Sequence, residues 1–217
     1  MLSPASVQRF YDRFGARQDS QAFYEDRALD ALLANSALAD AHTILEFGCG
    51  SGRFAKRILT LFPEALYEGF DVSTTMVGLA RRSLTGFGDR AVVHQLEPGT
   101  VELPVRDQST DRVISTYVLD LLPIPDIKIF FEEARRVLTP QGRLSLVSLT
   151  NGGGALTRVI SRLWHLVFRL NPHLVGGCRP IELGQFCEQA RWDIVHHATA
   201  VRWAISSEVL VARPHAA

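Results

Sequence analysis

Three alternating glycines and one downstream aspartate are the residues whose types and spacing indicate ligand binding in this chain. An apolar stretch runs into Gly48, Gly50 and Gly52, and Asp71 follows nineteen residues after the last glycine. Glycines let a backbone turn tightly and approach a ligand, and a carboxylate after the next apolar stretch can accept hydrogen bonds from ribose hydroxyls. A dinucleotide fingerprint would have its third glycine at Arg53, and no phosphate-binding Gly-Lys-Ser/Thr ending is present. The pattern therefore predicts a site for a nucleoside without a pyrophosphate.

Strands must alternate with helices to bring these residues together at one edge of a sheet. Apolar and polar periodicities predict this alternation, which implies a parallel, doubly wound α/β sheet. The predicted strands are 43–47, 66–70, 91–95, 112–116, 143–149, 193–198 and 208–212. The predicted helices are 53–61, 73–82, 127–138 and 181–190, with further helical patterning over 5–38 and 155–170.

Length and composition indicate one globular domain. The chain has 217 residues, of which 47% are hydrophobic and 21% charged, with a formal net charge of zero, as is ordinary for a soluble α/β protein. Three scattered cysteines favour neither a disulfide framework nor a metal site. No apolar run reaches the ~18 residues of a membrane span, and the first residues lack a signal-peptide pattern. We therefore expect a cytoplasmic location.

Four ordered motifs across residues 44–149 resemble those of class I S-adenosylmethionine-dependent methyltransferases of the small-molecule, quinone and lipid type. They are EFGCGSG at 46–52, GFDVS at 69–73 with Met76, LP at 103–104 with DRVIS and VLDLL at 111–122, and EARRVLTPQGRL at 133–144. The resemblance implies a seven-stranded Rossmann-like sheet, mostly parallel, with the last strand antiparallel and placed between its neighbours. It also implies S-adenosyl-L-methionine as the cofactor and S-adenosyl-L-homocysteine as the product.

The resemblance also implies a division of the single domain 1–217. Residues 1–42 would be a helical cap, 43–150 the cofactor-binding core, 151–180 a lid or substrate segment, and 181–217 the closing helix and strands. We expect the acceptor to be decided by the cap and the lid, where the resemblance is weakest.

The cofactor-binding residues implied by the motifs lie mainly in the glycine turn and after the second strand. Asp71 would hold the ribose, Glu46 the amino-acid end of the cofactor, and Met76 the adenine. Other interpretations remain open: Glu46 as a solvated turn residue, Cys49 as a small space-filler, and Met76 as a core residue. The full expected set is Gln18, Glu46, Phe47, Gly48, Cys49, Gly50, Gly52, Asp71, Val72, Met76, Glu97 and Thr116.

Three segments depart from the family pattern, the first of which also has Gly15 in place of an alanine. Gln18 stands where an N-terminal "YDxxAxxYD" segment has its second tyrosine, and it can still hydrogen-bond a carboxylate. After the third strand the usual adenine-binding aspartate is missing, so Glu97 or a backbone carbonyl would replace it. Asp120 stands where "VLHHL" has its first histidine, which would put a carboxylate near the acceptor.

Catalysis of methyl transfer makes few demands on side chains. A sulfonium methyl is already activated, so the protein must align the acceptor and exclude water, and a base is needed only for a hydroxyl or a protonated amine. No pair of residues has a spacing that singles it out as catalytic. The candidates near the expected mouth are Tyr11, Tyr24, Tyr117, Asp120, His165 and His173.

A basic segment lies between Ala134 and Ile181, where seven arginines occur and no aspartate or glutamate. In its predicted helix 155–170 one stripe is basic, a wide arc is apolar, and the stripe consists of Arg158, Arg162, His165 and Arg169. Two interpretations remain open: a lid packed on the core, or contact with an anionic membrane through Arg158, Arg162 and Arg169. The zero net charge disfavours a nucleic-acid partner.

The expected function is transfer of a methyl group to a small, hydrophobic or lipid-like acceptor, such as a quinone, a polyketide-like molecule or a phospholipid headgroup. The alternative is a binding or regulatory protein that keeps the methyltransferase fold without transferring a methyl group.

Overall fold

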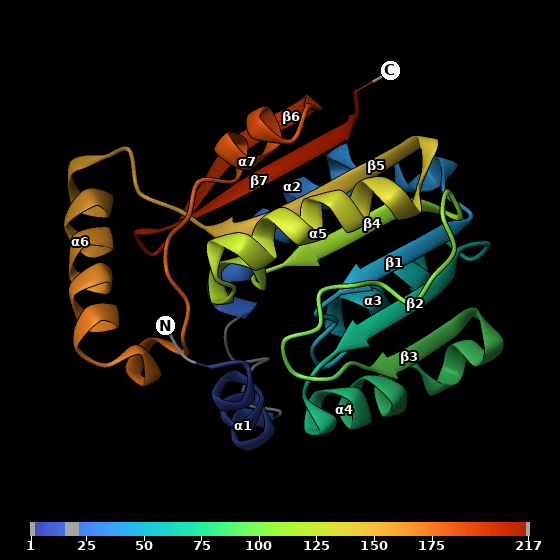
Figure 1. The fold of residues 1–217 in the computed structure, drawn as a ribbon, viewed down its shortest axis with the longest axis horizontal. Helices are drawn as coiled ribbons and strands as arrows, with labels where there is room; N and C mark the ends of the chain where they lie inside the picture. Colours follow the sequence, from blue (N-terminus) through green and yellow to red (C-terminus); the bar gives the residue numbers. More distant parts are fainter. Residues whose placement is uncertain (1–2, 16–21, 216–217) are drawn as a thin grey trace.

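The protein folds around one seven-stranded sheet with the strand order β3-β2-β1-β4-β5-β7-β6 (Figure 1). The computed structural model describes residues 3–15 and 22–215. Six strands run in one direction, and β7 between β5 and β6 is antiparallel to both of its neighbours. The strands are β1 Thr43–Phe47, β2 Leu66–Asp71, β3 Ala91–Gln95, β4 Thr110–Thr116, β5 Leu138–Leu149, β6 Trp192–Arg202 and β7 Ile205–Pro214. The predicted fold class, including the position of the last strand, is confirmed.

Helices cover both faces of the sheet (Figure 1). One core cluster joins one face of the sheet to α5 and α7, and the other joins the opposite face to α2, α3 and α4. The helices are α1 Pro4–Phe14, α2 Ala22–Asn35, α3 Arg53–Leu61, α4 Thr74–Leu84, α5 Ile124–Val137, α6 Ala155–Leu170 and α7 Leu183–Gln189. Short 3₁₀ turns lie at η2 Leu38–Asp40, η3 Thr85–Arg90, η4 Leu119–Leu121 and η5 Pro172–Val175.

Local signals explain most boundaries of the elements. The Ser73 side chain accepts a hydrogen bond from the backbone N–H of Met76 and so caps α4. The helix predicted over 155–170 is present as α6 with the same bounds. Figure 1 shows α6 at one end of the sheet, beyond the layers of helices that cover its two faces.

The last two strands are longer than the predicted 193–198 and 208–212. They form a hairpin with a two-residue turn at Trp203 and Ala204, whose φ values of 52° and 58° suit the twist of paired strands. Ser206 and Ser207 follow Ile205 at the start of β7 and are buried, so a pattern of apolar residues alone does not reveal this part of the strand. β6 is an edge strand with a bulge, because the pairing register shifts between Ile194 and His196.

Ion pairs and a hydrogen bond connect the two N-terminal helices, α1 and α2, to the elements around the glycine turn. On α2, Glu25 and Asp26 both form ion pairs with Arg53, at 2.8 and 2.5 Å, in the first turn of α3. On α1, Asp12 accepts a hydrogen bond from the Ser73 hydroxyl at 2.6 Å. The two helices therefore hold Arg53, which follows the glycine turn, and Ser73, which follows Asp71. Among the described residues, no helix combines the length and apolarity needed to cross a bilayer.

Candidate functional site: a pocket at the carboxyl ends of the strands

The glycine turn lies between β1 and α3 and is bonded to the end of β2. The backbone N–H groups of Gly48 and Cys49 donate to the carbonyl of Phe70 at 2.7 and 3.0 Å. Gly48 has a φ of 78°, and a Cβ there would come within 2.2 Å of the Val118 side chain. Only glycine fits such a position, because the left-handed backbone and the close contact both exclude a side chain. The turn therefore keeps its backbone directly beneath the pocket.

Asp71 is fixed by the same turn. Its Oδ2 accepts a hydrogen bond from the Gly50 N–H at 2.9 Å, and its Oδ1 accepts one from the Ser73 N–H at 2.8 Å. Each carboxylate oxygen keeps further acceptor capacity, which can receive a pair of vicinal hydroxyls. Burial raises the pKa of Asp71 to about 6, and the backbone hydrogen bonds from Ser73 and Gly50 oppose this rise. At neutral pH the group is therefore mainly the carboxylate.

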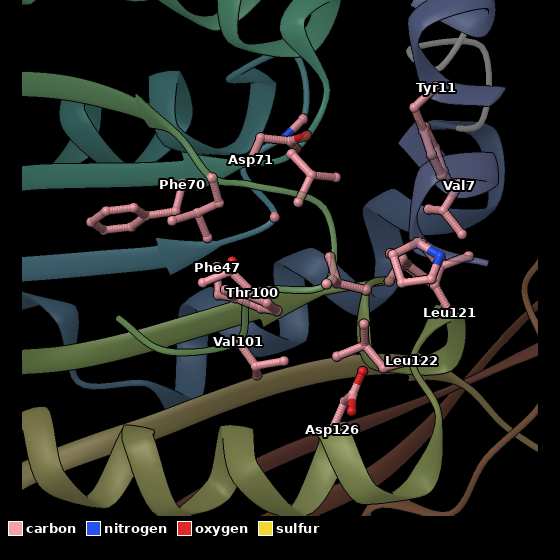
Figure 2. Close-up of a pocket in the computed structure, with 18 of the residues that line it drawn as sticks. Val7, Tyr11, Phe47, Phe70, Asp71, Thr100, Val101, Leu121, Leu122 and Asp126 are labelled. Carbon is pink, nitrogen blue, oxygen red and sulfur yellow. The ribbon is translucent and has the colours of Figure 1, made fainter. Parts of the chain in front are cut away.

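A cavity of about 980 Å³, including the space at its open mouth, extends from Asp71 across the ends of β1 and β4 to α5. Figure 2 shows Asp71 on one side of it, the α1 side chains Val7 and Tyr11 on another, and Asp126 near Leu122 at the far side. Of the expected site residues, it is lined by Tyr11, Phe47, Gly48, Gly50, Asp71, Val72, Thr116 and Tyr117. Most other lining residues are apolar, so the site is suited to a ligand with large apolar parts.

Several expected cofactor ligands lie outside the lining of this cavity. Cys49 and Met76 are buried, and Gly52 packs against the backbone of α4. Glu97 is exposed on the loop after β3, whose neighbouring Leu96 and Gly99 do line the cavity. Gln18 lies outside the described residues.

Glu46 lies beneath the glycine turn and is 1% exposed. Its Oε2 accepts a hydrogen bond from the Tyr67 hydroxyl at 2.6 Å. Burial raises the pKa of Glu46 to about 8, and the Tyr67 hydrogen bond only partly opposes the rise. The alternative interpretation of Glu46 as a solvated turn residue is therefore wrong.

The tyrosine candidates are neutral hydrogen-bonding groups. The Tyr117 hydroxyl lies 2.9 Å from the Ser207 hydroxyl, and its ring meets the Tyr24 ring edge to face at 5.8 Å. Burial is the largest cause that raises the pKa of Tyr11, Tyr24 and Tyr117 above the ordinary range, and the nearby Asp120 adds to it. Phenols in this state can donate hydrogen bonds but are poor bases.

Asp120 is fully buried behind the pocket wall formed by Leu121 and Leu122. Its Oδ2 accepts a hydrogen bond from the Leu149 N–H at 3.1 Å, whereas its Oδ1 has no hydrogen-bond partner among the described residues. Burial raises the pKa of Asp120 to about 7, with the Leu149 hydrogen bond and Arg179 opposing the rise.

Of the two histidine candidates, the structure describes the side chain of His165 alone, and it does not line the cavity. His165 is on α6, and its Nε2 lies 3.1 Å from the Asn151 side-chain oxygen. His173 lies in η5, and its side chain is outside what the structure describes. Within the described residues, His, Cys, Asp and Glu side chains form no cluster of three that could hold a metal ion.

Several residues that line the cavity could not be predicted as lining residues from the sequence. Val7 comes from α1, Thr100 and Val101 from the irregular loop after β3, and Asp126 from the first turn of α5. These segments have no periodicity that distinguishes lining from core. Only Asp126 carries a signal, because acidic residues are favoured in the first turn of a helix, and that signal concerns the helix rather than a ligand.

The comparisons with known proteins agree with this geometry. Residues 44–142 match a family model described as a methyltransferase domain. A malonyl-(acyl-carrier protein) O-methyltransferase of Hahella chejuensis is 29% identical over 167 residues, or 76% of this chain and 56% of that protein. The chain thus spans only about half the length of this relative.

Solved structures share the fold at low sequence identity. The crystal structure of the 4+2 cyclase SpnF aligns with a TM-score of 0.75 at 17% identity, covering 99% of this chain and 97% of that one. Magnesium protoporphyrin IX methyltransferase from Synechocystis, solved with bound S-adenosylhomocysteine, aligns with a TM-score of 0.65 at 18% identity, covering 87% and 81%. Residues 44–142 thus match a methyltransferase domain, with motifs that resemble the class I S-adenosylmethionine-dependent family and a fold that the solved structures share.

Proposed function

We propose that this protein transfers the methyl group of S-adenosylmethionine to a small, apolar or lipid-like acceptor. The observation that carries the proposal is the position of Asp71. Its two oxygens are oriented by the N–H groups of Gly50 and Ser73, at the edge of a cavity with mainly apolar walls. A ribose on Asp71 would place the rest of the cofactor along the glycine turn and leave the apolar remainder of the cavity for the acceptor.

The bound cofactor would supply an electrophilic methyl group, and the chain's residues would supply position and a dry environment. Asp71 would hold both ribose hydroxyls, and the Gly48–Gly50 backbone would lie close to the amino-acid end. Leu121, Leu122 and Val101 would exclude water from the line of attack. Tyr11, on α1 above the cavity, would donate a hydrogen bond to the acceptor or to the cofactor carboxylate rather than remove a proton.

Asp120 is the carboxylate we propose as a positioning residue for the acceptor side. Its buried Oδ1 has no partner among the described residues, and its other oxygen holds the end of β5 through Leu149. It would fix η4, whose Leu121 lines the cavity. The roles of Glu46, Cys49, Gly52, Met76 and Glu97 toward the cofactor would then be indirect, through the turn and the loop that they support.

The acceptor class remains open among quinones, polyketide-like molecules, phospholipid headgroups and carrier-bound acyl groups. The Hahella relative is named for a malonyl group on a carrier protein. We propose that the protein works in the cytoplasm, on such acceptors rather than on nucleic acid, and that it meets an anionic membrane through Arg158, Arg162 and Arg169.

The test is calorimetric titration with S-adenosylmethionine and S-adenosylhomocysteine, followed by transfer of labelled methyl to a panel of acceptors. We expect micromolar binding of both cofactors, lost in Asp71→Ala, and labelled product from at least one apolar acceptor. The matched control is Asp126→Ala, which removes a carboxylate from the far side of the same cavity. Cofactor binding without transfer to any acceptor would favour the alternative, a methyltransferase-fold protein that only binds. No binding by the wild-type protein would overturn the proposal.

A further inference from the structure

Helix α6 presents a continuous apolar stripe to the outside of the molecule. Val159, Leu163, Leu166 and Leu170 are 60%, 57%, 52% and 78% exposed, and their spacing of four, three and four residues places them on one side of the helix. The inward side carries Thr157, Ile160, Trp164, Val167 and Phe168, which are buried or half-buried. The helix is therefore apolar on both sides, although one side already packs on the protein.

The outward stripe is bordered by positive charge. Arg158, Arg162 and Arg169 are exposed beside the four apolar residues, and α6 contains no aspartate or glutamate. His165, which falls on the same stripe in the sequence, is half-buried and turned toward Asn151. The exposed surface of α6 is thus a band of leucine and valine next to a band of arginine, about 24 Å long for sixteen residues.

A second apolar group lies at the same end of the sheet. Because Leu149 at the end of β5 pairs with Ser207, the β6–β7 turn lies close to where the chain leaves for α6. Trp203 in this turn is 72% exposed, and Arg202 beside it is also exposed. Figure 1 shows the start of β7 on the side of the sheet that faces α6. Exposed tryptophan beside arginine is typical of side chains that lie at a membrane–water interface.

The helix is bonded to the wall of the pocket. The Trp164 indole N–H, from the inward side, donates to the carbonyl of Cys178 at 3.0 Å. The Cys178 sulfur in turn lies 3.9 Å from the hydroxyl of Tyr11, which lines the cavity. Gly176, in the same loop, packs against the Phe10 ring of α1. The loop after α6 therefore connects the exposed helix to the α1 side of the cavity mouth.

We propose that α6 docks onto an anionic phospholipid bilayer and that the acceptor reaches the cavity from that bilayer. The apolar stripe would enter the acyl boundary, while the arginines would meet the phosphate groups and keep their charge in water. The acceptor is accordingly an apolar molecule dissolved in the membrane. This second statement rests on the proposed methyl transfer, whereas the docking itself does not.

The pairing of these two bands favours a bilayer over a protein partner. An arginine band alone would fit any acidic surface, and an apolar stripe alone would fit a second copy of the chain. Side by side along four turns of a helix, with an exposed tryptophan at the neighbouring turn, they match the layered chemistry of a lipid surface.

Sedimentation with vesicles tests the docking. The full chain is mixed with vesicles of phosphatidylcholine alone or of phosphatidylcholine with phosphatidylglycerol, whose anionic headgroups give the negative surface potential that attracts basic segments. We expect binding to the anionic vesicles only, weakened by salt. The triple variant Arg158→Glu, Arg162→Glu, Arg169→Glu and the pair Leu163→Gln, Leu166→Gln should each lower binding at least tenfold. A triple variant with the same charge change elsewhere, Arg82→Glu, Arg106→Glu, Lys128→Glu, should bind more strongly than the α6 triple variant.

Two further measurements separate the possible failures. All variants should bind S-adenosylhomocysteine as the wild type does, so a loss there would report misfolding and not docking. Methyl transfer to an acceptor held in anionic vesicles should fall with vesicle binding, whereas transfer to the same acceptor in detergent should not. Equal binding of wild type and α6 variants to vesicles would overturn the proposal. So would a wild-type dimer that the leucine variants convert to a monomer, or binding to an acidic carrier protein in place of vesicles.

Discussion

Substitution of Glu46 by glutamine should make the protein less sensitive to alkaline pH. Glu46 is 1% exposed beneath the glycine turn, where the Tyr67 hydroxyl donates to it. Burial holds its pKa near 8, against 4.5 for an unperturbed glutamate. A glutamine of the same shape can accept the Tyr67 hydrogen bond and carries no proton to lose.

The sign follows from which state holds the proton. Between pH 4.5 and 8 the folded protein keeps the Glu46 proton that the unfolded chain has released, so the free energy of unfolding falls as pH rises through this window. From pH 6 to the folded pKa near 8, this linkage lowers the free energy of unfolding of the wild type by about 1.4 kcal/mol per pH unit. Above pH 8 the Glu46 proton is lost from both states, and little further change follows. The wild type should therefore lose roughly 3 kcal/mol more than Glu46→Gln over that range.

Guanidinium unfolding at pH 6, 7.5 and 9, without cofactor, measures this difference. Tryptophan fluorescence, to which the buried Trp192 contributes, reports the transition. Glu64→Gln is the control, because Glu64 is exposed and its replacement should leave the pH dependence of the wild type unchanged. The quantity compared is the difference between wild type and variant, in which the other titrating groups cancel.

Two results would refute the reasoning. Parallel stability curves for wild type and Glu46→Gln would mean that Glu46 is ionised in the folded protein throughout the range. A fall in the free energy of unfolding between pH 6 and 9 that is larger for Glu46→Gln than for the wild type would mean that the charged carboxylate stabilises the turn, contrary to its burial.

Three other predictions concern the pocket and its support. Gly48→Ala should lower the free energy of unfolding by roughly 1–3 kcal/mol because of the left-handed backbone alone, and the contact with Val118 should add to this loss. The variant should also lose cofactor binding. Chemical denaturation measures the first effect and calorimetry the second. Because the pKa of Asp71 is about 6, the affinity for S-adenosylhomocysteine should fall by up to about tenfold per pH unit below pH 6. In calorimetric titrations at pH 5, 6 and 7.5, Asp71→Asn should remove both the affinity and its pH dependence. Arg112 is buried and donates hydrogen bonds to the carbonyls of Ser36 and Ala37. Arg112→Met leaves those carbonyls unpaired, so it should lower the free energy of unfolding in urea by about 3 kcal/mol. A loss below about 1 kcal/mol would contradict this account.

The central part of the fold is predictable from the sequence because its signals are local. The strand 43–47, the turn at Gly48–Gly52 and the N-cap Ser73 each combine an apolar run with a glycine or a capping residue. These signals place Asp71 beside the turn without any knowledge of distant contacts. The bounds of α6 follow from the glycines before it and the Asn-Pro after it.

The remaining features depend on contacts between distant segments. The local sequence does not show whether the Glu46 side chain enters the cavity or lies beneath the glycine turn. Its position beneath the turn depends on the hydrogen bond from Tyr67 on the neighbouring strand. Likewise, the arginine spacing of α6 predicts the basic stripe, but only the packing of Trp164 shows which apolar residues stay exposed. The length of the β6–β7 hairpin depends on buried serines and on a turn that tolerates two left-handed residues.

The bulge in β6 has a consequence for the behaviour of the protein at high concentration. β6 is eleven residues long and forms one edge of the sheet, with Ile194 and Val195 exposed on it. A straight edge of this kind offers unpaired backbone groups on which another chain could add a strand and begin to aggregate. The extra residue Val195 interrupts the even spacing of those groups, so only the short segments on either side remain regular enough to pair. Deletion of Val195 would restore a continuous edge, and turbidity on storage would then be expected to rise.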